Sequence, residues 1–297
     1  MSKISLYNRE TKSIEEEFVF EKQFMDFFYS NKFGLFLSDL ILKRPFISKM
    51  LGMRENLSSS KKRIKPFIEK YKINTNEILE PLESFKTFNE FFTRKLKVSA
   101  REVKMGQNIL ISPSDARLLA YKIDKNTVIP VKGLKFTLDE LIGDDSIINT
   151  YNKGTCLVFR LAPVDYHRFI YIDNGTHDEI KSIGKYFHSV NPLALKNNFS
   201  VFQKNYREIC ILKTANFGDV IHIDVGALGV GKIIQNHREK ASFLKGEEKG
   251  YFEFGASTIV LIFKPSTVKI DKDIIEFSKK GIETIVKCGS SIGEKRV

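Results

Sequence analysis

Three short segments of the sequence carry side chains that could do chemistry, and the first is LAPVDYHRF at residues 161–169. It places Asp165, Tyr166, His167 and Arg168 side by side, just ahead of a strand-like run. A histidine next to an aspartate can transfer protons near neutral pH, so this segment is a candidate acid–base site. A buried structural histidine is the alternative. The remaining histidines show no HxH or HxxxH spacing, and we expect no metal site.

The second segment, ISPSDARLLA at residues 111–120, places a carboxylate in a turn. Asp115 follows Ser112, Pro113 and Ser114 and precedes an apolar run. An ordinary Asx turn is the simplest interpretation of such an aspartate, because its side chain can accept a hydrogen bond from the backbone ahead of it.

The third segment is GYFEFGASTIVLIF at residues 250–263, where two strand patterns flank the small residues 255–258. A serine hydroxyl on a strained turn can attack the carbonyl carbon of the residue before it, because the nucleophile is already held against its target. Ser257 is therefore a candidate nucleophile. An ordinary bulge or hairpin is the alternative.

The elements that must position these residues change in character along the chain. Residues 23–53 mix large apolar side chains with basic ones and predict short amphipathic helices, which either lie in a lipid interface or pack on the rest of the protein. Thr87 and Glu90 have the spacing of a capping box at the start of a further helix. From about Ile109 onward, short β-type runs alternate with Gly, Asn and Asp turn signals.

These patterns predict an α+β protein in two parts. The first is a helical N-terminal region at residues 1–80, and the second is a β-rich, double-sheet domain at residues 81–297. With 297 residues, 42% of them hydrophobic, the chain can bury a sizeable core.

The charge and the cysteines narrow the classes of partner. A formal net charge of +12 favours an anionic partner such as a nucleic acid or an acidic lipid surface. The basic residues are dispersed and no nucleic-acid-binding signature accompanies them, so we expect no nucleic-acid partner.

The three cysteines form no CxxC pair and are expected to be reduced. The N-terminus lacks the apolar core of a signal peptide, and no window reaches the roughly 18 apolar residues of a spanning helix. We expect a protein that is neither exported nor membrane-spanning.

Taken in order, these segments resemble the phosphatidylserine decarboxylases over nearly the whole chain. The matching stretches are FKTFNEFFTRKL, ISPSD, LAPVDYHRF, DNG, SVNPLAL, GDVIHIDVGA, VGKI and KGEEKGYFEFGASTIVLIF. Two of them, SVNPLAL and YFEFGASTIVLIF, are most similar to members from low-GC Gram-positive bacteria such as clostridia.

The resemblance implies a proenzyme that cuts itself and makes its own pyruvoyl cofactor. Ser257 would attack the carbonyl of Ala256, and β-elimination of the resulting ester would leave a pyruvoyl group at the start of residues 257–297. The pyruvoyl carbonyl would condense with the amine of phosphatidylserine and accept the electrons released as the carboxylate leaves as CO₂. The product would be phosphatidylethanolamine.

The resemblance also implies roles and partners. His167 would serve the decarboxylation step, and Asp115 would orient the base that activates Ser257. The helices within residues 1–80 would associate with a membrane surface that contains anionic lipid, as a peripheral protein on the cytoplasmic side of the cell membrane. Relatives suggest a homodimer, either of the proenzyme or of the cleaved chain pairs.

Four departures from the family pattern fall on these motifs. Ile170 stands where the family has a second histidine, the base that joins aspartate and serine during self-cleavage. Ala256 and Ala116 replace glycines, and Leu228 replaces a threonine. Isoleucine cannot accept a proton, and alanine restricts the backbone at the bond to be cut, so we expect slow or absent self-processing.

Three interpretations stay open at this point. The chain is a phosphatidylserine decarboxylase, matured slowly, in which His188 could serve as the substitute base. Alternatively it is an unprocessed pseudoenzyme that binds anionic phospholipid without converting it. A third interpretation keeps the pyruvoyl chemistry but changes the substrate to a soluble amino acid such as tryptophan.

Overall fold

The computed structural model describes eight ranges of the chain. These are residues 4–17, 53–123, 129–131, 134–136, 149–183, 206–226, 232–255 and 257–296. Apart from Met53, the amphipathic segment predicted at residues 23–53 lies outside these ranges, and so do Leu228, His188 and Ala256. The helical membrane-associating region is therefore not confirmed. Within the described ranges, no helix combines the length and apolar character needed to cross a bilayer.

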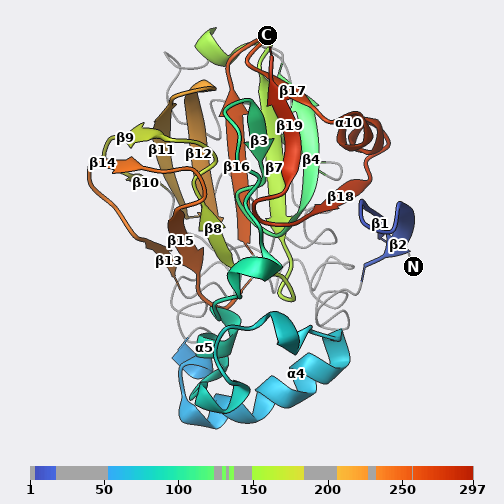
Figure 1. The fold of residues 1–297 in the computed structure, drawn as a ribbon, viewed down its shortest axis with the longest axis vertical. Coiled ribbons are helices and arrows are strands. Elements are labelled where there is room, and N and C mark those ends of the chain that lie inside the picture. Colours follow the sequence, from blue (N-terminus) through green and yellow to red (C-terminus); the bar gives the residue numbers. More distant parts are fainter. Residues whose placement is uncertain are drawn as a thin grey trace, which may run out of the picture.

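The largest sheet of the described ranges has 11 strands. Its long strands β12, β16, β7 and β4 lie at the centre of the view in Figure 1. Its strand order is β14-β9-β11-β12-β16-β7-β4-β18-β1-β2, with β10 paired to β11. The bounds are β14 Ala241–Phe243, β9 Gly175–His177, β11 Arg207–Thr214, β12 Gly218–Gly226, β16 Ser257–Phe263, β7 Thr155–Leu161, β4 Ala116–Lys122, β18 Glu283–Val286, β1 Ser5–Asn8, β2 Ser13–Glu16 and β10 Lys181–Ile183. Every residue of the central strands β7 and β16 is buried, which explains their nearly continuous apolar sequences.

Three smaller sheets accompany the main one, so the described strands form four sheets rather than the two expected. The first contains β13 (Ile233–Gln235), β15 (Glu248–Phe252) and β8 (Arg168–Ile170). The second contains β17 (Val268–Ile270), β19 (Ser291–Lys295) and β3 (Ile109–Ile111), and the third pairs β5 (Ile129–Val131) with β6 (Leu134–Phe136). The prediction of a β-rich body is confirmed. The number of sheets was missed because sequence patterns mark strands but not their pairing partners.

The helical elements of the described ranges are short. They are η2 Ser58–Arg63, α4 Ile64–Tyr71, η3 Thr75–Glu77, η4 Leu82–Ser84, α5 Phe88–Phe92, η5 Val98–Ala100 and α10 Lys272–Lys279. Helices α4 and α5 lie at one end of the main sheet, away from the C-terminus (Figure 1). They share a separate aromatic cluster in which Phe67, Phe88 and Phe91 are buried.

The predicted capping box at the start of α5 is confirmed for Thr87, whereas Glu90 binds the residue before the N-cap. The Thr87 hydroxyl accepts a hydrogen bond from the backbone N–H of Glu90 at 3.1 Å. The Glu90 carboxylate accepts one in return from the backbone N–H of Lys86 at 2.6 Å. Both bonds satisfy donors at the start of the chain segment that forms α5.

A hairpin of β1 and β2 extends the edge of the main sheet, and the sequence analysis predicted no strand there. β1 pairs with β18 in parallel, with Leu6 opposite Glu283. Just beyond β2, the Glu17 carboxylate forms an ion pair with Arg160 at 2.8 Å. The first residues of the chain therefore pack on the β-rich body. The sequence of these residues shows no clear alternation of apolar and polar side chains. Charged side chains on the β-rich body, such as Arg160, bind some of them instead.

Arg160 carries a stability prediction because it lies between two buried carboxylates. It contacts Glu17 at 2.8 Å and Glu283 at 2.5 Å. Arg160→Leu leaves both acids without this guanidinium and is expected to cost about 3–5 kcal/mol. The measurement is urea denaturation in a Ser257→Ala background, which keeps every molecule as one chain.

Lys280→Ala is the matched control for Arg160→Leu. Lys280 forms an exposed ion pair with Glu276 at 2.6 Å, and its loss should change the free energy of unfolding by about 0.5 kcal/mol or less. Equal denaturation midpoints for the two variants would show that the buried ion network contributes nothing to stability.

Candidate active site

Ser257 is the first residue of β16 and lies deep in the main sheet. It is opposite Gly226 of β12 on one side and Leu161 of β7 on the other. Its side chain is fully buried, and its Oγ atom has no hydrogen-bond partner among the described residues. A buried hydroxyl without a partner costs about 1–3 kcal/mol, so its presence here needs an explanation.

The chain crosses from one sheet to another immediately before Ser257. β15 ends at Phe252 in a three-stranded sheet, whereas β16 begins in the main sheet, so the two strands do not form a hairpin. Gly255 has a φ of +142°, a backbone conformation that side chains rarely allow. The small residues between the two strand patterns therefore serve a change of sheet.

Helix α5 holds the segment that leads to Ser257. The Asn89 side-chain oxygen accepts a hydrogen bond from the backbone N–H of Phe254 at 2.8 Å. The Phe254 ring packs at 5.4 Å from the ring of Phe88 and 5.1 Å from that of Phe92, measured between centroids. The motif containing FNEFF thus braces the backbone upstream of the serine. Sequence analysis missed Asn89, although a polar residue within an apolar helical face was a usable signal.

His167 is fully buried against the same helix. Its ring lies 4.0 Å from the ring of Phe92, and its Nδ1 atom lies 3.0 Å from the backbone oxygen of Asp165. Its own carbonyl accepts a hydrogen bond from the N–H of Phe252 at 3.0 Å, which fixes it to the end of β15. The Nε2 atom has no hydrogen-bond partner within the described ranges.

Burial lowers the pKa of His167 to about 3. Backbone contacts with Asp165 and Gly255 oppose this effect, while the positive charges of Arg94 and Arg117 lower the pKa further. The imidazole is therefore neutral at physiological pH, because protonation would place a second charge in a dry, already positive environment.

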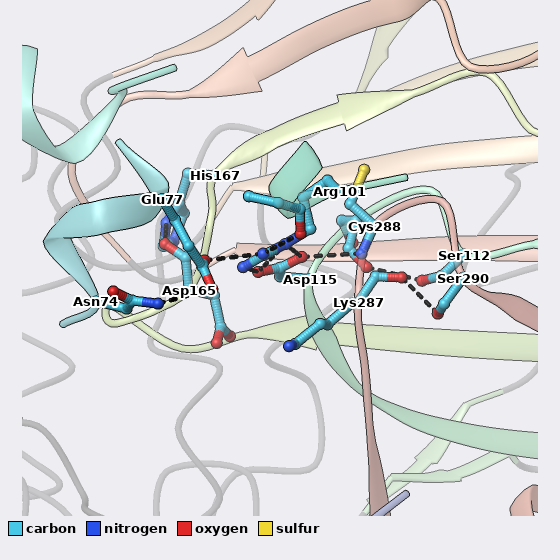
Figure 2. Close-up of polar contacts among 12 residues, drawn as sticks. Asn74, Glu77, Arg101, Ser112, Asp115, Asp165, His167, Lys287, Cys288 and Ser290 are labelled. Atoms are coloured by element: carbon cyan, nitrogen blue, oxygen red, sulfur yellow. Dashed lines mark hydrogen bonds and ion pairs between the residues drawn. The ribbon is translucent and has the colours of Figure 1, made fainter. Parts of the chain in front are cut away.

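The Asp115 carboxylate is occupied by an arginine. Figure 2 shows it between Arg101 and Cys288. The guanidinium of Arg101 donates from Nε to Oδ1 at 2.7 Å and from Nη2 to Oδ2 at 2.6 Å, and the N–H of Cys288 donates to Oδ1 at 2.8 Å. Arg101 also binds Glu77 at 2.9 Å. Asp115 therefore forms no simple Asx turn, and its carboxylate meets a guanidinium rather than an imidazole.

Ile170 lies next to the turn that carries Asp115. Its N–H donates to the carbonyl of Pro113 at 2.9 Å, and its side chain is buried in the main core cluster. A histidine at this position would lie close to the Asp115 turn. The isoleucine instead gives the core an apolar side chain with no proton acceptor.

The Asp165 carboxylate does not contact His167. It pairs with the Arg117 guanidinium and accepts the N–H of Ala162 at 2.7 Å. Adjacency in the sequence suggested an aspartate–histidine pair, but only the backbone carbonyl of Asp165 reaches the imidazole.

Arg94 is a buried cation that the sequence analysis did not single out. Within the described ranges its Nε has no hydrogen-bond partner, and its Nη1 reaches only the carbonyl of Phe91 at 3.4 Å. Burial lowers its pKa to about 10. Arg94 lies two residues after the end of α5, in the stretch FFTRKL. The sequence analysis quoted this stretch, but nothing in it indicated that the arginine is buried.

A serine buried at a crossing between two sheets, with a neutral histidine bound to the strand before it, suits a protein that acts on its own backbone. The model of the phosphatidylserine decarboxylase family matches residues 88–294. A phosphatidylserine decarboxylase proenzyme from Clostridium botulinum (strain Langeland) is 45% identical over 294 residues, which are 99% of this chain and 100% of that protein.

Two further relatives carry the same name. The proenzyme from Clostridium beijerinckii is 44% identical, over 98% of this chain and 99% of that protein. The proenzyme from Clostridium perfringens (strain ATCC 13124) is 43% identical, over 98% of this chain and 100% of that protein. The chain belongs to the phosphatidylserine decarboxylase family, which is a family of carboxy-lyases.

The lowered pKa of His167 gives a direct spectroscopic prediction. In the Ser257→Ala chain labelled at histidine, the imidazole signal that disappears in His167→Gln should stay at the shift of a neutral ring between about pH 5 and pH 8. The physical reason is that burial keeps the pKa of His167 far below its ordinary value. A titration midpoint near 6.5 would contradict the dry environment described above.

Proposed function

We propose that this chain is a proenzyme that converts phosphatidylserine to phosphatidylethanolamine. The reaction would use a pyruvoyl group formed from Ser257 after cleavage of the bond between Ala256 and Ser257. The observation that carries the proposal is the buried hydroxyl of Ser257, which follows Gly255 and has no hydrogen-bond partner within the described ranges, in a chain that belongs to this family.

The residues around Ser257 fit a pyruvoyl group. The hydroxyl that must react has no competing hydrogen-bond partner among the described residues, and the segment before it is held by Asn89. Once formed, the group would supply an electron sink for the loss of CO₂ from the substrate. His167, neutral and with Nε2 unoccupied, would hold or release a proton beside it. The rings of Phe92 and Phe254 would exclude water from this position.

Slow maturation follows from the surroundings of Asp115. The base that the family places at position 170 is absent, since Ile170 offers no proton acceptor. Asp115, which the resemblance assigned to orienting that base, is bound by Arg101 and the backbone of Cys288 instead. Self-cleavage of the bond before Ser257 would therefore lack the assistance of that base, and general-base assistance is worth about 10²–10⁴ in rate.

Attachment to an anionic membrane surface is part of the proposal. The substrate is a bilayer lipid, and the formal net charge of +12 favours a surface that contains anionic lipid. We assign the contact to the amphipathic segment at residues 23–53 and place the protein as a peripheral protein on the cytoplasmic side of the membrane. A homodimer remains the assembly proposed from the resemblance.

The alternative of a pseudoenzyme has no support from the comparisons, because the relatives reported above are all named as proenzymes of the decarboxylase. We therefore propose no second function.

The maturation chemistry predicts the behaviour of three chains on a denaturing gel and by intact mass. The natural chain should split slowly into residues 1–256 and 257–297, and Ser257→Ala should never split. Ile170→His combined with Ala256→Gly should split about 10²–10⁴ times faster, because it restores the missing base and a flexible bond. Rapid, complete splitting of the natural chain during expression would contradict the predicted effect of Ile170.

The substrate is tested separately with the fast-splitting double variant. Its processed form should release CO₂ from phosphatidylserine in detergent micelles and yield phosphatidylethanolamine, whereas Ser257→Ala should release none. A fully processed variant that converts free tryptophan but not phosphatidylserine would overturn the proposed substrate.

A further inference from the structure

We propose that His167 is the base that takes the proton from the Ser257 hydroxyl during self-cleavage, in place of the missing histidine at position 170. The inference rests on the proposed self-cleavage at Ser257. It gives His167 a task before the decarboxylation step, and it identifies how a chain with Ile170 could still mature.

The tautomer of His167 follows from the hydrogen bond of its Nδ1 atom, which at 3.0 Å is the defined contact of the ring. The partner of Nδ1 is the backbone oxygen of Asp165, which can only accept. Nδ1 must therefore carry the proton of the neutral ring, and Nε2 holds a free lone pair. Within the described ranges that lone pair has no donor, and the atom is buried. A buried, neutral imidazole nitrogen of this kind can act as a general base.

Ser257 supplies the complementary group. Its hydroxyl is a buried donor without an acceptor in the part of the chain that the structure describes. His167 lies against the segment that leads to Ser257, since its carbonyl accepts the N–H of Phe252 and the Phe92 ring contacts both the His167 ring and Phe254. The backbone of Gly255, one residue before the bond to be cut, also interacts with the imidazole and raises its pKa.

The other candidate bases in the described ranges are occupied or distant. The Asp115 carboxylate is bound by Arg101, and that of Asp165 by Arg117. His222 also has a ring nitrogen without a partner, Nδ1. However, His222 pairs with Leu261, four positions along β16 from Ser257, which corresponds to about 13 Å of strand.

The proton transfer balances without a further reactant. The Ser257 proton moves to Nε2 of His167 as the bond from Oγ to the carbonyl carbon of Ala256 forms. The imidazolium then gives the proton to the nitrogen of Ser257 as its bond to that carbon breaks. An ester replaces the amide, and the imidazole is again neutral. Arg94 and Arg117 make the imidazolium costly, so the step is slow rather than forbidden.

The test is a cycle of substitutions in the full chain, followed by intact mass over a long incubation. In the natural background, His167→Gln should reduce cleavage by about 100-fold or more, since glutamine cannot take the proton. In the Ile170→His background, His167→Gln should keep most of the cleavage, because the second imidazole then serves as the base. Rescue of this kind distinguishes a base from a residue that merely shapes the site.

Two matched controls use other histidines. His222→Gln and His188→Gln should leave the cleavage rate of the natural chain unchanged, and circular dichroism checks that each variant is folded. Loss of cleavage in His188→Gln with normal cleavage in His167→Gln would overturn the inference. Loss of cleavage on His167→Gln in both backgrounds would also overturn it, because the role would then be structural.

The dependence of the cleavage rate on pH is an independent test of the role of His167. Cleavage through His167 should keep the same rate from about pH 8 down to about pH 5, because the buried ring stays neutral there between the cations Arg94 and Arg117. A rate that falls with a midpoint near 6.5 would point to an ordinary, solvated base and overturn the inference.

Failure of this inference is distinguishable from failure of the proposed function. A natural chain that stays intact while Ile170→His cleaves and forms phosphatidylethanolamine would reject His167 as the base and leave the function standing. Intact chains in both cases would reject both.

Discussion

The crossing from β15 to β16 is the constraint on which the rest of the site depends. The chain leaves a three-stranded sheet at Phe252 and enters the main sheet at Ser257, so the backbone between them must change layer within a few residues. Gly255 supplies the conformation, and Asn89 of α5 holds the N–H of Phe254. Ser257 is thereby buried with its hydroxyl unpartnered among the described residues, and the surrounding core offsets a cost of about 1–3 kcal/mol.

Around this crossing, the charged groups are paired with one another, and the group that could transfer a proton is a neutral imidazole. The Asp115 and Asp165 carboxylates are each matched by an arginine, which satisfies buried charges that would otherwise be prohibitive. Among the described residues, the His167 ring hydrogen-bonds a backbone carbonyl and no carboxylate, and it remains neutral. The proton acceptor that this site offers is therefore the lone pair of a neutral imidazole and not a carboxylate. This arrangement suits an intramolecular acyl shift, in which no charged reactant has to enter from water.

The sequence was informative wherever local chemistry decides structure. The runs TCLVFRL and STIVLIF were recognisable as strands because buried strands are apolar throughout. Thr87 and Glu90 marked a helix start because a capping box acts within one turn. The partners of Asp115 and Asp165 were not predictable in this way, because Arg101 and Arg117 reach them from other elements and no local pattern specifies such pairs. The β1–β2 hairpin was missed for the same reason, since its strands depend on β18 and on Arg160.

By itself, the sequence determined the family, the β-rich body, the serine at position 257 and the absence of a proton acceptor at position 170, because motifs and residue types are properties of the chain. Only the tertiary structure decided that Ser257 is buried, that Asp115 binds Arg101, and that Nε2 of His167 has no hydrogen-bond partner among the residues that the structure describes. The physical reason is that burial and hydrogen-bond partners arise when distant segments pack together. The protonation state of His167 depends on that packing.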